Sequence, residues 1–214
     1  MKNLFNLENP VLRAMDRLAD LVVLGQLCLL CCIPIVTAGP AFVALFKAVY
    51  DLTTDRGGGV VKNYFRAFRS NFKQAVIVWI PILLFTVSLI CDWILLRLNE
   101  HGTFYTVLIC VVLAILVLAG GILSFAFPLI SRYSNTVWEH IHNAMLLMIQ
   151  NIPKTLLMVL IQVLPLLSAL FLTDILLRTL LLWILFYPGL SVQINVLLIR
   201  PVFENMEKQL SKSE

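Results

Sequence analysis

Long runs of apolar residues dominate the sequence, and their lengths predict its elements. A helix needs about 20 apolar residues to cross the hydrocarbon core of a bilayer. Four runs reach that length, at about 76–98, 104–130, 154–173 and 176–199. A fifth run, 18–36, reaches it with Asp20 at the interface. Because only helices and closed barrels satisfy their backbone polar groups in lipid, these runs predict an all-α fold, a polytopic transmembrane helical bundle.

A sixth, shorter segment at 41–52 decides the number of crossings. It reads AFVALFKAVYDL and carries Lys47 and Asp51, which lie four residues apart and can pair on one helix face. The segment fits a short span, a re-entrant helix or an interfacial helix. If it crosses, the bundle has about six spans, five long and one short.

The distribution of basic residues favours six crossings with both termini in the cytoplasm. In that topology thirteen Lys and Arg residues lie in the inner regions 1–17, 53–75, 131–153 and 200–214 or at an inner helix end, and two flank the outer loops. Short cytoplasmic loops are rich in Lys and Arg, so this bias indicates the orientation. A re-entrant segment at 41–52 that returns the chain would give the same bias. We therefore expect a multi-pass protein of the cell membrane.

Composition supports one membrane domain. Hydrophobic residues make up 60% of the 214 positions and charged residues 13%, whereas soluble domains are about half apolar and a quarter charged. A soluble protein of this length could not bury so much apolar surface. We therefore expect a single multi-spanning membrane domain over residues 1–214. The net charge of +4 follows from the basic loops, and because the sequence holds no nucleic-acid-binding motif, we expect no nucleic acid partner.

A basic and aromatic segment lies in the first large inner loop, after the helix-breaking Gly57-Gly58-Gly59. Its rings, with near-helical spacing, are Tyr64, Phe65, Phe68 and Phe72, and its cations are Lys62, Arg66, Arg69 and Lys73. This pattern predicts an interfacial amphipathic helix whose four cations bind anionic lipid at the inner face. The alternative is a helix that packs on the bundle and extends its cations to the water.

Ionisable residues within membrane spans are costly, so they are candidate functional positions. The candidates here are Lys47, Asp51 and Asp92. Pairing, or a position near a helix end, also accounts for each of them without a functional role.

A weak internal repeat links the two halves of the chain. Asn63-x7-Asn71-x-Lys73 precedes one proline-containing span, and Asn143-x7-Asn151-x2-Lys154 precedes another. The two halves would run in the same direction, as in the parallel repeats of some transporters. Chance similarity between two apolar hairpins is the other explanation.

The sequence lacks the common signatures of catalysis and of metal or cofactor binding. His140 and His142 stand two residues apart and so do not share the helix face that a zinc hydrolase motif needs. Cys28, Cys31 and Cys32 share a face, but their apolar neighbours supply no further ligands. We therefore expect neither an enzyme nor a bound cofactor or metal.

Two stretches resemble the YesL-type family of bacterial integral membrane proteins. They are CIPIVTAGPA at 32–41, a turn marked by proline and glycine, and YFRAFRSNFKQA at 64–75, the basic and aromatic segment. The family is largely uncharacterised, and its genes often stand beside carbohydrate ABC transporters and sugar-degrading enzymes. The resemblance implies an accessory or regulatory component of carbohydrate uptake, with such an ABC transporter as candidate partner. The alternative is a small transporter or channel in its own right.

The first of these motifs also has a physical interpretation. Pro34 ends one helix and Pro40 begins the next, because proline is favoured in the first helical turn. Gly39 permits a tight backbone between them, and Thr37 can cap the incoming helix. These residues explain a turn without a ligand.

Overall fold

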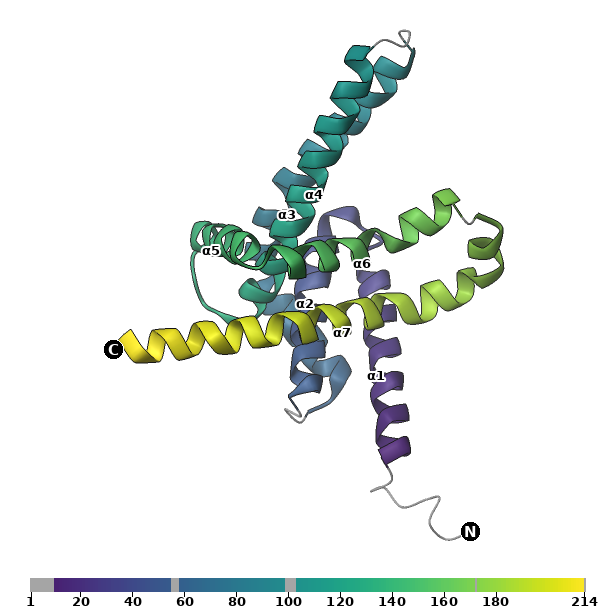
Figure 1. The fold of residues 1–214 in the computed structure, drawn as a ribbon. Coiled ribbons are helices and arrows are strands. Elements are labelled where there is room, and N and C mark those ends of the chain that lie inside the picture. The colour runs from purple at the N-terminus through teal and green to yellow at the C-terminus, as the bar shows by residue number, and fades with distance from the viewer. Residues whose placement is uncertain (1–9, 55–57, 99–102, 172, 214) are drawn as a thin grey trace.

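The fold is all-helical, as predicted. The computed structural model describes residues 10–54, 58–98, 103–171 and 173–213, and no strand occurs among them. The helices are α1 (Pro10–Cys31), the short 3-10 helix η1 (Ile35–Thr37), α2 (Ala38–Thr53), α3 (Val60–Leu98), α4 (Thr103–Arg132), α5 (Val137–Gln150), α6 (Ile152–Phe171) and α7 (Thr173–Ser213). In Figure 1 the α3–α4 and α6–α7 hairpins extend in different directions from α2.

Five segments of the described chain are long and apolar enough to cross a membrane. They are Ile35–Thr53, Val60–Cys91, Cys110–Arg132, Ile152–Ala169 and Leu177–Lys208. This set supports a multi-pass protein, but it differs from the predicted one, because it includes the short segment and omits α1. The 22 residues of α1 are sufficient in length, but their ionisable side chains, Arg13 to Asp20, all lie in the first half. The sixth span and the orientation of the termini stay predictions.

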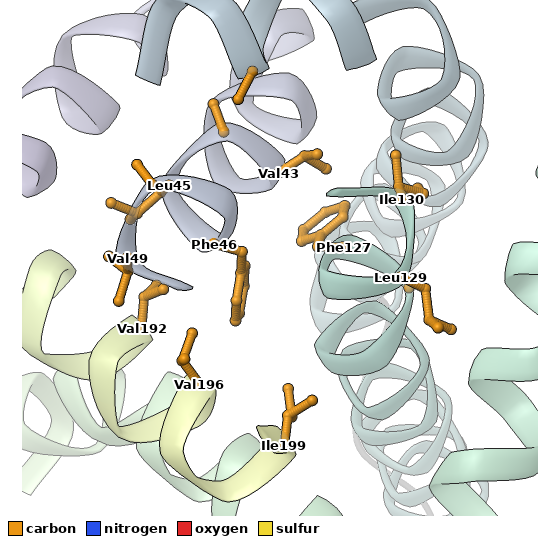
Figure 2. Close-up of a cluster of buried hydrophobic side chains, with 14 of the residues drawn as sticks. Val43, Leu45, Phe46, Val49, Phe127, Leu129, Ile130, Val192, Val196 and Ile199 are labelled. Carbon is orange, nitrogen blue, oxygen red and sulfur yellow. The ribbon is translucent and has the colours of Figure 1, made fainter. Parts of the chain in front are cut away.

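The short segment around α2 forms the centre of the bundle. In the 18-residue apolar stretch of the candidate span Ile35–Thr53, 56% of the residues are buried, against 11–28% in the corresponding stretches of the other four. α2 packs against α1, α3, α4 and α7. Figure 2 shows Phe46 of α2 with Phe127 of α4 on one side and Val192 and Val196 of α7 on another. The segment 41–52, whose crossing of the membrane the sequence left open, is therefore part of the helix that the other helices enclose.

A close contact between α2 and α3 depends on Gly39. This residue lies inside α2, and a Cβ there would be 2.5 Å from the Cβ of Trp79 on α3. The Trp79 indole Nε1 also donates to the Ile35 carbonyl at 2.8 Å. Gly39 is therefore needed for its small size and not, as the sequence suggested, for the backbone of the turn.

The predicted role of Thr37 is wrong. Its hydroxyl donates to the carbonyls of Cys31 and Pro34, and it makes no side-chain hydrogen bond to the start of α2. The last carbonyls of a helix lack intrahelical partners, so a nearby hydroxyl is drawn to them. Thr37 thus completes the end of α1 and does not cap α2.

The basic and aromatic segment is not a separate helix. It is the first part of α3, whose 39 residues extend about 58 Å, nearly twice the thickness of a bilayer's hydrocarbon core. The Tyr64 ring is fully buried and its hydroxyl donates to the Ala41 carbonyl of α2 at 3.3 Å, whereas Phe65 and Phe72 are exposed. The segment therefore packs on the bundle, as the alternative interpretation expected. An interfacial position in a bilayer stays a prediction.

Two glycines allow α1 and α7 to cross closely. A Cβ at Gly189 would lie 2.1 Å from the Leu21 carbonyl oxygen, and one at Gly25 would lie 2.9 Å from the Gly189 nitrogen. Small residues at such crossings let helix backbones approach in membrane proteins.

Pro165 in α6 and Pro188 in α7 each free a carbonyl, and side chains of other helices bond to both of these carbonyls. Pro188 has no N–H for the Ile184 carbonyl four residues earlier, and the Gln26 amide of α1 donates to that oxygen at 2.8 Å. Pro165 likewise frees the Ile161 carbonyl, which accepts the Tyr187 hydroxyl. Helices α1, α6 and α7 are therefore held together in part by the carbonyls that these two prolines leave unpaired.

The internal repeat has a partial counterpart in three dimensions. Asn71 and Asn151 each donate their side-chain amide to the carbonyl four residues earlier, at 3.0 Å and 3.1 Å. In the first half the helix continues through this point, whereas in the second half it breaks at Asn151 between α5 and α6. Pro153 explains the break, because proline is accepted in a first turn but not in a helix interior.

Candidate functional site

A cationic cavity of about 540 Å³ lies where the end of α2, the first turns of α3 and the end of α4 meet. Four basic residues and one acidic residue line it, and amide and hydroxyl groups complete its polar wall. The charged residues are Lys47, Asp51, Arg66, Lys73 and Arg132. We take this cavity as the candidate functional site because it brings together residues that the sequence singled out separately.

Lys47 and Asp51 form the ion pair that their spacing predicts. Their charged groups are 3.6 Å apart on α2, with side chains 28% and 16% exposed. The pair lies at the wall of the cavity, where Lys47 can extend its ammonium group toward solvent.

Arg132 connects three helices at the edge of the cavity. Its guanidinium donates to the Tyr50 hydroxyl at 2.6 Å and to the Glu207 carboxylate at 2.8 Å, and it lies 4.7 Å from the centre of the Tyr50 ring. The Tyr133 hydroxyl donates to the same carboxylate at 2.7 Å. Burial raises the pKa of Tyr133, and the hydrogen bond to Glu207 adds to this, so the hydroxyl keeps its proton. Sequence reasoning missed this cluster, because Tyr50 and Glu207 are distant from Arg132 along the chain.

The structure separates the four cations predicted to bind lipid into two pairs. Arg66 and Lys73 line the cavity, whereas Lys62 and Arg69 do not. All four fall on one stripe of α3 about 60° wide, because successive residues advance by about 100°. Only the edge of the stripe that faces α2 and α4 contributes to the cavity.

Arg66 and Lys73 have no ion-pair partner among the described residues. The other two cations of the cavity are compensated, Lys47 by Asp51 and Arg132 by Glu207. The cavity therefore carries two uncompensated positive charges.

The third candidate polar residue, Asp92, is not part of this site. It belongs to α3, but its side chain lies outside the described part of the structure. It follows Gln74, the last α3 residue in the cavity wall, by 18 residues, or about 27 Å of helix.

Two polar side chains within the apolar body of the bundle bond to each other, whereas the buried side-chain oxygen of Asn195 and both ring nitrogens of His140 have no hydrogen-bond partner among the described residues. The Gln162 amide of α6 donates to the Ser124 hydroxyl of α4 at 2.7 Å, and that hydroxyl donates to the Gly120 carbonyl. A second cavity of about 320 Å³ beside Gln162 has mostly apolar walls, including Phe42, Trp79 and Phe127. These hydrogen bonds are of the kind that hold membrane helices together.

Exposed apolar side chains define the class of protein. Leu84 of α3, Leu166 of α6 and Leu181 of α7 are 64%, 61% and 80% exposed, on helices long enough to cross a bilayer. Lipid tails can cover such faces, whereas water would leave a large apolar surface exposed. The chain is a multi-pass helical membrane protein.

Comparison with known proteins gives one match. Residues 18–93 match the sequence profile of an uncharacterised family, described as "Protein of unknown function, DUF624". The matched range contains α2 and most of α3, and so supplies four of the five charged residues of the cavity. Neither a curated protein nor a solved structure matches the chain.

Proposed function

We propose that the protein is an accessory or regulatory component of carbohydrate uptake in the cell membrane, and that it catalyses no reaction. The observation that supports this role best is the cationic cavity, which offers a binding site at one end of α2. The resemblance of the chain to YesL-type proteins supplies the link to carbohydrate uptake.

The orientation follows from the basic residues. With both termini in the cytoplasm, the cavity and the basic stripe of α3 face the cytoplasm, where the membrane surface is anionic. The exposed apolar faces of α3, α6 and α7 would then contact lipid or the helices of a partner such as an ABC permease.

Co-purification from native membranes tests the accessory role. The tagged full-length chain should retain an ABC permease in a fixed stoichiometric ratio after solubilisation in mild detergent. Sugar flux into liposomes that contain this chain alone would contradict the proposal, as would recovery of the chain without a transport protein.

A transporter is the second candidate, and the position of Lys47 and Asp51 favours it. An ion pair at the wall of a cavity can open to accept a charged substrate, and the two halves of the chain share the Asn71 and Asn151 hydrogen bonds. Replacing Lys47 and Asp51 together by leucine should then abolish flux in liposomes.

The matched control replaces another pair with the same spacing. Arg200 and Glu204 form an i,i+4 ion pair at 2.8 Å on α7, and neither lines the cavity. Leucine at both positions should leave flux unchanged if the chain transports through the cavity. Equal losses of flux in the two double variants would contradict a transport role for Lys47 and Asp51.

A further inference from the structure

We infer that the cationic cavity binds a phosphate monoester group, carried either by a lipid headgroup or by a soluble phosphorylated compound. The inference uses the cavity of the proposed function and names its ligand class. Binding to the purified chain and co-purification with a partner are separate measurements, so either proposal can fail alone.

The charge balance of the cavity selects a dianion. Lys47 is compensated by Asp51 at 3.6 Å, and Arg132 by Glu207 at 2.8 Å. Two positive charges remain without an ion-pair partner in the described structure, those of Arg66 and Lys73. A phosphate monoester carries about −1.5 to −2 charges at neutral pH and offers three acceptor oxygens, so it matches both the charge and the donors.

The two cations are spaced for a shared ligand. Arg66 and Lys73 are seven residues apart on α3, which places them on one helix face two turns apart, about 10 Å along the axis. Both side chains are long and exposed, so their charged ends can converge on one group in the cavity. The arginine can bind two phosphate oxygens with its planar fork, while the lysine acts as a point charge.

The wall opposite this helix face is fixed by other contacts. Arg132 of α4 is held by Tyr50 and Glu207, and the Asn135 carbonyl in the segment after α4 accepts the Gln74 amide of α3 at 3.0 Å. A rigid wall lowers the cost of binding, because fewer side chains lose freedom when a ligand enters.

The volume and the neutral polar groups indicate a ligand larger than inorganic phosphate. About 540 Å³ corresponds to the volume of roughly 18 water molecules. The Asn63 side-chain amide lines the cavity and makes no hydrogen bond to the described residues, so it can bind a hydroxyl group of the ligand. A glycerol phosphate, as found in a lipid headgroup or free in solution, has this combination of groups.

Binding measurements on the full-length chain in phosphatidylcholine nanodiscs test the inference. One arm titrates sn-glycerol 3-phosphate by calorimetry, and the other includes phosphatidic acid in the nanodisc and follows its phosphorus resonance. Saturable binding in the first arm identifies a soluble ligand, and saturable binding in the second alone identifies a lipid headgroup. Absence of saturable binding in both arms overturns the inference.

Two double variants separate a built site from general electrostatic attraction. Arg66→Gln with Lys73→Gln removes the two uncompensated cations, and each lost charge-assisted contact should weaken binding by about tenfold. Lys62→Gln with Arg69→Gln removes the same charge from the same helix outside the cavity, and binding should change by less than about threefold. Equal weakening in the two double variants overturns the inference.

The conservative exchange provides a check against loss of folding. Arg66→Lys with Lys73→Arg keeps both charges and should retain binding within about tenfold, because only the fork geometry is lost. Helix content and the unfolding midpoint of all three double variants should equal those of the unmodified chain, since the replaced groups have no ion-pair partner among the described residues. An exchange variant that folds normally but binds as weakly as the Gln double variant contradicts a role for the two charges.

Discussion

The hydrogen bond from Gln26 to the Ile184 carbonyl gives the sharpest test of the fold. Pro188 leaves this carbonyl without its helical partner, and the Gln26 amide occupies it at 2.8 Å across the α1–α7 crossing. Replacing Gln26 by leucine removes the donor and leaves the Ile184 carbonyl, which is exposed at the surface of the bundle, without a partner in the hydrocarbon of a bilayer or micelle. Replacing Pro188 by alanine restores an N–H at the position where a regular helix would supply it.

The magnitude follows from the cost of the unpaired carbonyl. An unsatisfied acceptor that water cannot reach costs about 1–3 kcal/mol in soluble proteins, whereas hydrogen bonds between membrane helices average about 0.6 kcal/mol. We therefore expect Gln26→Leu to lower the free energy of unfolding by about 1 kcal/mol. The weaker contact of the same amide to the Leu185 carbonyl, at 3.2 Å, adds little, because that carbonyl keeps its own position in the helical ladder. In a chain that already carries Pro188→Ala, the loss of unfolding free energy caused by Gln26→Leu should fall toward zero.

Equilibrium unfolding in mixed micelles, followed by tryptophan fluorescence, measures the four proteins of this double-mutant cycle. The control is Gln74→Leu, which removes a side-chain donor to the Asn135 carbonyl at a distant site, and its cost should be the same with Pro188 or alanine. If Gln26→Leu lowers the free energy of unfolding equally with proline and with alanine at position 188, then Gln26 does not stabilise the fold through the carbonyl that Pro188 leaves unpaired.

Three further predictions concern groups outside this crossing. Burial lowers the pKa of His140 from its ordinary value of 6.5, so the unfolded chain binds a proton first as pH falls. In a pH series the free energy of unfolding should therefore be retained above about pH 6.5 and should fall below it, by up to about 1.4 kcal/mol per pH unit, and His140→Phe should reduce this slope just below pH 6.5. Gly189→Ala forces a Cβ against the Leu21 carbonyl and should lower the unfolding free energy by about 1–3 kcal/mol in micelles. Glu207→Gln removes an exposed ion pair to Arg132 and should cost less than about 1 kcal/mol, a difference that shrinks in molar salt.

The sequence predicted the helices well, because long apolar runs have few other structures available. The sequence did not indicate which helix lies at the centre of the bundle, because the most buried helix is the short one, α2. α2 lacks a long apolar run, but its small residues Ala41, Ala44 and Ala48 let neighbouring helices approach, and all three are buried. The charges that make this segment look marginal, Lys47 and Asp51, lie near its end and pair with each other. Apolar length measures how well a helix fits lipid, and a helix surrounded by protein does not depend on it.

The candidate site was predictable only in part. The basic stripe of α3 was visible in the sequence, but the choice of Arg66 and Lys73 over Lys62 and Arg69 depends on how α3 packs against α2 and α4. That packing rests on a contact between Gly39 and Trp79, whose effect no local pattern reveals. Which side chains line the cavity is decided by tertiary packing, so it can be seen only in the assembled helices.

The two halves of the chain share a local hydrogen bond but not a binding site. Near Asn151 a third cavity, of about 370 Å³, lies beside Lys154, the single charged residue in its wall. The corresponding region near Asn71 gathers four basic residues, and one of them, Arg132, is held by Glu207 of the other half. In carriers built from two repeats the substrate site lies at the interface between the halves, near the middle of the bilayer. Here the second half supports the site of the first, but the cavity lies where α2 and α4 end, and this position differs from the central site of such carriers.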